Sequence, residues 1–105
     1  MTDLTAFLNA RLDEDEVAAK AAADGPWKSS GPYVDAPGAG IILQARHTED
    51  AAHAARHDPA RALREVEAKR RLIKEITLRS TPDVAEIYLA VLASVDSDHQ
   101  DFRPE

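Results

Sequence analysis

Two of the four histidines have a spacing that suits metal binding. His53 and His57 are four residues apart, so on a helix both imidazoles lie on one face, with Asp58 beside them. His99 is a candidate third ligand and His47 a further one. A catalytic zinc site needs three protein ligands and a water, and alanine follows His53 where the metalloprotease motif has glutamate. Metal binding through His53, His57 and His99 is therefore an alternative hypothesis, beside packing of His57 at a helix break and solvation of His53.

Basic side chains gather in the second half of the chain, where they could meet phosphate groups. No helix-turn-helix glycine turn, zinc knuckle or aromatic stacking surface accompanies them, and the net charge of −6 opposes general binding to nucleic acid. A run of acidic residues offers a simpler partner, within one molecule or across a dimer. The basic residues of the nucleic-acid alternative are Arg64, Lys69, Arg70, Arg71 and Lys74, and the acidic run is Asp13, Glu14, Asp15 and Glu16.

Covalent catalysis has little support in the sequence. The chain has no cysteine, which removes thiol nucleophiles, disulfides and cysteine-ligated metals. Its serines lack the strained elbow motif of hydrolases, and the glycines at 38 and 40 lie between expected strands rather than before a helix, so they form a turn and not a phosphate loop. We therefore expect a protein that is not an enzyme and needs no cofactor.

Length and composition limit the size of the core that can position these residues. The chain has 105 residues, and 20 of its apolar residues are alanine, which leaves 26 larger side chains for a core. A single domain over 1–105 with a thin core follows. The N-terminus has no secretory pattern and no apolar run approaches the length of a membrane helix, so we expect a cytoplasmic protein without membrane contact.

Periodicity and turn residues predict an α+β fold that is mostly helical. The expected elements are helices over 3–23, 48–56, 59–78 and 82–95, a β-hairpin over 27–46, and a loosely ordered tail over 96–105. Thr48 is the expected cap of the second helix, and Asp58-Pro59 and Thr81-Pro82 are strong start signals for the next two. Trp27 is the expected anchor of the hairpin on the helices, and the run Ile41-Ile42-Leu43 predicts cover on both faces of its strand.

Two helical stripes carry most of the large apolar residues. The residues of the last helix, which form the cleanest stripe, are expected to be central to the core: Val84, Ile87, Tyr88, Val91, Leu92 and Val95. The long helix 59–78 presents Leu63, Val66, Ile73 and Ile76, with Arg70 interrupting the stripe. Because the chain has too little apolar material to cover this helix, the sequence predicts a homodimer, or another protein partner, bound there. The predicted interaction residues are Leu63, Val66, Arg70, Ile73, Lys69, Arg71, Lys74, the acidic run 13–16 and Trp27.

A resemblance rests on four stretches of the chain. The segment 55–72, ARHDPARALREVEAKRRL, resembles the signature of a family of small uncharacterised proteins from high-GC Gram-positive bacteria and their phages. The opening LTAFLNARLDEDE, Gly25-Pro26-Trp27 and the ending DHQDFRP are similar to that family too. The hairpin is more apolar here, and the cysteine-containing insert that many relatives carry before the last helix is missing. The resemblance implies a context of phages or mobile elements and supports the order of elements, but it implies no activity and no site residues.

Overall fold

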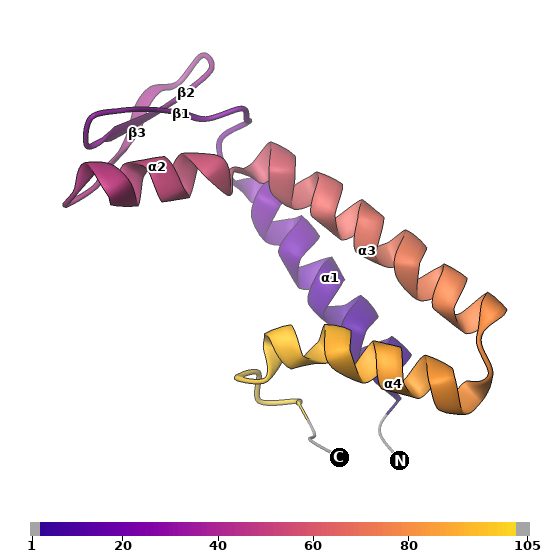
Figure 1. Cartoon of the computed structure of the whole chain (residues 1–105). Coiled ribbons are helices and arrows are strands. Elements are labelled where there is room, and N and C mark those ends of the chain that lie inside the picture. Colours follow the sequence, from indigo (N-terminus) through magenta and orange to yellow (C-terminus); the bar gives the residue numbers. More distant parts are fainter. Residues whose placement is uncertain (1–2, 103–105) are drawn as a thin grey trace. The chain divides into compact units, whose positions relative to one another are not determined.

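The computed structural model describes residues 3–102 and divides the chain into two compact units (Figure 1). The central unit runs from Asp15 to Val66, and the terminal unit joins the residues up to Glu14 to those from Glu67 onward. The elements, in chain order, are α1 (Leu4–Ala21), β1 (Lys28–Ser30), β2 (Tyr33–Ala36), β3 (Gly40–Gln44), α2 (Thr48–Arg56), α3 (Pro59–Arg79), α4 (Pro82–Ala93) and the 3-10 turn η1 (Ser94–Asp96). The predicted class, mostly helical α+β, is confirmed, and α1 and α3 each run through both units.

The central unit is built on a small antiparallel sheet with strand order β1-β2-β3. The predicted hairpin is β2 and β3, and β1 is an additional strand whose Lys28 pairs with Asp35. Helix α2 packs on β1 and β2. The side chains of Val34 and Ala51 are fully buried in this unit. Apolar residues on alternate positions of β2 thus form the small core beneath the helix.

The prediction of cover on both faces of β3 is wrong. Ile41 is 63 % exposed and Leu43 is 42 % exposed, while Ile42 is half-buried. β3 is an edge strand, and α2 packs on the other two strands. A continuous apolar run indicates a doubly covered strand only where a second layer exists, and this short chain does not place one over β3.

Side-chain caps begin the helices at most of the predicted positions. The Thr81 hydroxyl accepts a hydrogen bond from Val84 N–H at 3.4 Å, and Pro82 occupies the first turn of α4. Asp3, a predicted cap, accepts from Ala6 N–H at 3.1 Å at the start of α1. The predicted cap Thr48 is wrong, because Thr48 is already the first residue of α2 and the capping position is held by His47, whose side chain makes no capping bond.

Helix α4 buries a different face from the predicted one. Ala85, Leu89 and Ala93 are buried and are spaced four residues apart, so they lie along one side of the helix. Of the predicted core stripe Leu92 is half-buried, and the other five residues are exposed. Alanines at both ends of the buried side allow close approach of a neighbouring surface, which large side chains at Val84 or Val91 would prevent. Five of the thirteen apolar residues in the described core are alanine, so counting only large residues misplaced this core.

Candidate functional site

A row of exposed large apolar side chains runs along α4 and into the η1 turn that follows it. Its members, called the α4 face below, have exposed fractions between 40 % and 70 %: Val84, Ile87, Tyr88, Val91 and Val95. Val84, Tyr88, Val91 and Val95 follow one another at steps of four, three and four residues, the spacing of a helix–helix seam. Large exposed apolar patches mark binding surfaces in soluble proteins.

The charges of the terminal unit are separated between its helices. Helix α4 contains Asp83 and Glu86 and no basic residue, and neither carboxylate has a hydrogen-bond or ion-pair partner within residues 3–102. On α3, Arg71 and Lys74 are exposed. Arg79 is 79 % exposed and pairs with Glu75 one turn earlier. The terminal unit therefore has acidic and apolar side chains exposed on α4 and basic side chains exposed on α3.

The stripe of α3 predicted to bind a partner is covered by this chain. Val66 is 4 % exposed and Ile73 is 3 % exposed, while Leu63 and Ile76 are half-buried. Burial removes these apolar side chains from the surface that a partner can contact. The large apolar side chains that remain exposed in this unit include those on α4.

The acidic run finds partners inside the molecule. Arg70, which interrupts the apolar stripe of α3, is paired with Asp13 at 2.7 Å. Glu16 pairs with Lys20 at 3.1 Å, Glu14 binds Arg11 as described below, and Asp15 also makes an interaction. The expectation of an acidic partner within one molecule is confirmed for Arg70. Among the other predicted basic residues Lys69 is half-buried, so Arg71 and Lys74 are the exposed ones in this part of α3.

A buried arginine, for which the sequence predicts no role, binds residues in the described part of the tail. Arg11 is 7 % exposed, and its guanidinium binds both oxygens of Glu14, at 2.9 and 3.2 Å. The same group lies 4.9 Å from the centre of the Phe7 ring. Its Nη1 donates to Nδ1 of His99 at 3.0 Å and lies 3.7 Å from a carboxylate oxygen of Asp101. Its position on the apolar stripe of α1, four residues after Phe7, was the available signal.

His99 is held in one tautomer by these contacts. Its Nδ1 accepts from Arg11 and from the backbone N–H of Asp101, both at 3.0 Å, and arginine can only donate. The ring proton therefore lies on Nε2, which faces Glu14 at 3.6 Å. Phe7 contacts the rings of His99 and Phe102 edge-on, each at 5.9 Å between centroids. The described part of the tail thus contacts α1 through both Phe102 and His99.

The three histidines of the metal alternative lie in different units. The rings of His53, on α2, and of His57, the residue at the C-cap of that helix, have their centroids 4.6 Å apart. His99 is bound to Arg11 in the terminal unit. No group of three or more histidine, cysteine or carboxylate side chains that could hold a metal ion occurs within residues 3–102. Metal binding through His53, His57 and His99 stays a prediction.

A hydrogen bond joins the Gly25-Pro26-Trp27 segment to Asp58 at the start of α3. Asp58 is 6 % exposed, and one carboxylate oxygen accepts from Arg61 N–H at 2.8 Å, which caps α3 as predicted. The other oxygen accepts from Trp27 N–H, also at 2.8 Å. The indole N–H of Trp27 donates to the carbonyl of Ala23 at 2.9 Å. The predicted anchoring role of Trp27 thus includes a backbone bond to the start of α3.

Close packing and charge reinforce this junction. A methyl group added at Gly25 would lie 2.9 Å from Cβ of Ala60 and 3.1 Å from the Asp58 carboxylate, so a larger residue does not fit. The N–H groups of Arg61 and Trp27 and the nearby Arg64 charge hold the pKa of Asp58 below its ordinary value, against the opposing effect of burial. Asp58 is therefore a charged group that links Trp27 to the start of α3.

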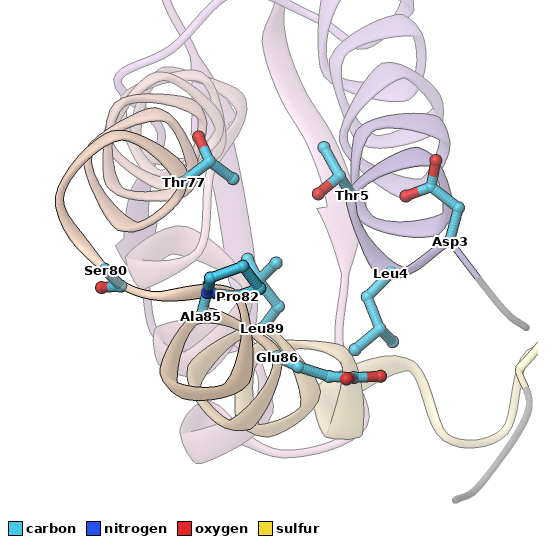
Figure 2. Close-up of a pocket in the computed structure, with 9 residues that line it drawn as sticks. All are labelled: Asp3, Leu4, Thr5, Thr77, Ser80, Pro82, Ala85, Glu86 and Leu89. Carbon is cyan, nitrogen blue, oxygen red and sulfur yellow. The ribbon is translucent and has the colours of Figure 1, made fainter.

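A cleft of about 450 Å³ opens in the terminal unit where α1 begins and where α3 passes into α4 (Figure 2). Leu4, Ala85 and Leu89 supply buried apolar lining. The carboxylates of Asp3 and Glu86 and several hydroxyl groups also line it. The volume falls in the range of small-molecule sites, although no nucleophile–base pair is among its lining residues.

Comparisons with known proteins place the chain in a family without giving it an activity. No helix within residues 3–102 has the length and apolar character needed to span a bilayer. No curated protein and no solved structure matches the sequence significantly. A family model does match, and it covers residues 1–105. Since that match spans the whole chain, the protein belongs to the family of unknown function DUF6221.

Proposed function

We propose that this protein is a small, non-enzymatic protein-interaction module that self-associates, and that the surface it uses is the α4 face. The observation that carries the proposal is the exposure of five large apolar side chains along α4 and the η1 turn that follows it, with Val91 66 % and Val95 70 % exposed. Leaving such a surface in water is unfavourable, and its burial favours association. The resemblance to proteins of phages and their hosts supports a phage or mobile-element context and a cytoplasmic location as part of the same proposal.

A second copy of the chain is the occupant that fits this surface. The four-three-four spacing along α4 suits a helix as the contacting element, and the second copy supplies an identical helix. In a two-fold interface each copy presents the same patch, so any contact between α4 and α3 of the partner occurs twice. In such a contact the exposed bases Arg71 and Lys74 of one copy oppose Asp83 of the other.

Replacing Val91 by glutamate tests this proposal. The carboxylate would be buried in the helix seam, so we expect the dimer dissociation constant to rise at least about tenfold. Val17→Glu is the matched control, because Val17 is 69 % exposed on α1, outside the α4 face, and the chemical change is the same. Analytical ultracentrifugation over a concentration series measures all three proteins. The wild type and Val17→Glu are expected at the dimer mass, and Val91→Glu at 11.4 kDa.

Two outcomes contradict the proposal. One is a wild-type protein that sediments as a monomer at tens of micromolar, and the other is equal weakening by Val91→Glu and Val17→Glu. Circular dichroism of both variants establishes that the helices are retained, so that a loss of association is not a loss of folding.

Exposed bases on α3 favour nucleic acid as a second candidate partner. Arg64, Arg71 and Lys74 are exposed on one helix, at steps of seven and three residues, and so share a side of it. If they contact phosphates, Arg71→Glu/Lys74→Glu should weaken binding to a labelled DNA duplex and lower the salt-dependence slope by about 2. Lys20→Glu, an exposed charge reversal on α1, is the control. Absence of wild-type binding in fluorescence anisotropy at low salt rejects this candidate.

A further inference from the structure

The geometry points to a binding site for an alkyl cation, the chemical class of an arginine or lysine side chain, in the cleft at the start of α1 and α4. Its lining includes the carboxylates of Asp3 and Glu86 and no basic group. Figure 2 shows Glu86 extending from α4 beside Leu4 and Leu89, with Asp3 on the α1 side. An aliphatic chain fits against the apolar lining while its charged head remains at the carboxylates.

The hydroxyl groups of the lining add polar partners. Thr5, Thr77 and Ser80 lie around the cleft, on α1, at the end of α3 and in the connection to α4. Each hydroxyl oxygen can accept a hydrogen bond from a guanidinium or ammonium N–H. A guanidinium is planar and carries five such donors, so it can engage carboxylate and hydroxyl oxygens together.

The carboxylates are available for a ligand. Glu86 has no hydrogen-bond or ion-pair partner within residues 3–102. Asp3 uses Oδ1 to cap α1 at Ala6 N–H, which leaves Oδ2. Two helices begin at the cleft, and helix N-termini alone attract anions. Here Asp3 already accepts from a free N–H group of α1, and Thr81 accepts from one of α4. The charge of the cleft lining is therefore negative, because Asp3 and Glu86 are its charged residues.

Titration of the full-length protein with n-butylguanidinium, followed by ¹H–¹⁵N NMR, tests the site. We expect binding in the millimolar range, with the largest shifts at the amides of Leu4, Thr77 and Leu89. The neutral isostere n-butylurea is expected to bind much more weakly because it lacks the charge. Glu86→Gln should raise the dissociation constant about fivefold. Glu67→Gln, an exposed change on α3 outside the lining, should leave it unchanged.

A second probe distinguishes the sources of the cation. N-acetyl-arginine methylamide carries the group on a peptide backbone, so its binding at the same amides supports a side chain of a protein as the ligand. Binding of n-butylguanidinium alone supports a free small cation. Equal binding of n-butylurea, insensitivity to Glu86→Gln, or absence of shifts at the cleft with both cations overturns the inference. Self-association is decided by mass and this site by amide shifts, so either proposal can fail without the other.

Discussion

Asp58→Ala is expected to lower the free energy of unfolding by about 3 kcal/mol. Loss of a helix cap costs about 0.5–2 kcal/mol, and leaving a buried N–H without an acceptor costs about 1–3 kcal/mol. Asp58 makes both contributions, because it caps α3 at Arg61 and accepts from Trp27 N–H while only 6 % exposed. Urea denaturation followed by circular dichroism measures the difference.

Asp3→Ala is the matched control for that substitution. Asp3 also caps a helix through one carboxylate oxygen, but it is exposed and makes no second backbone bond of this kind. We expect a loss of about 1 kcal/mol from it. Equal effects of the two substitutions would show that the bond to Trp27 adds nothing to stability.

The Asp58 contribution has a defined pH dependence. Its pKa in the folded protein is lowered from the ordinary value of 3.8 by the N–H groups of Arg61 and Trp27 and the charge of Arg64. A lowered folded-state pKa adds stability that is fully present above the unfolded-state pKa and lost as pH falls through the folded-state pKa. The difference in unfolding free energy between wild type and Asp58→Asn should therefore be constant near neutral pH and shrink in acid below about pH 4. A difference that grows in acid contradicts this assignment.

Arg11→Ala is expected to cost about 3 kcal/mol and to release the described part of the tail from α1. The substitution removes the bidentate ion pair with Glu14, the contact with the Phe7 ring and the donor to His99. Hydrogen bonds to charged groups contribute about 1.5–3 kcal/mol, and a cation over an aromatic ring about 0.5–2 kcal/mol. Because Glu14 is more than half exposed, it can be solvated after the loss, which limits the cost.

Hydrogen exchange identifies the local part of this effect. Amides of residues 97–102 should exchange faster in Arg11→Ala, since His99 and Phe102 both contact α1 through the same cluster. Arg79→Ala is the control, because Arg79 forms an exposed pair with Glu75 and its removal should cost less than about 0.5 kcal/mol. Unchanged exchange of the tail in Arg11→Ala would mean that Phe102 holds it without the arginine.

Local chemistry made the helix starts on the C-terminal side predictable. Asp58-Pro59 and Thr81-Pro82 combine a capping side chain with a proline whose missing N–H is not needed in the first turn. Both signals act over four residues, so they do not depend on tertiary context. The starts of α3 and α4 accordingly agree with the sequence prediction.

Packing decided the features that periodicity did not reveal. α4 has apolar residues on two sides, and whether Leu89 or Val91 is buried depends on how close a neighbouring surface can approach the alanines. Arg11 and Arg70 both interrupt apolar stripes. Their partners, His99 and Asp13, are distant in sequence, so the pattern around each arginine does not predict them. The cleft combines residues from near both ends of the chain, so its carboxylates have no common sequence motif.

The bond between Trp27 and Asp58 closes a chain loop of 31 residues that contains the whole sheet and α2. The entropy cost of closing a loop grows only with the logarithm of its length, by about 0.6 kcal/mol for each doubling. Residues inserted at the exposed turn 37–39 would therefore weaken this closure very little. The turn of the sheet can consequently be lengthened while the bond between Trp27 and Asp58 is kept.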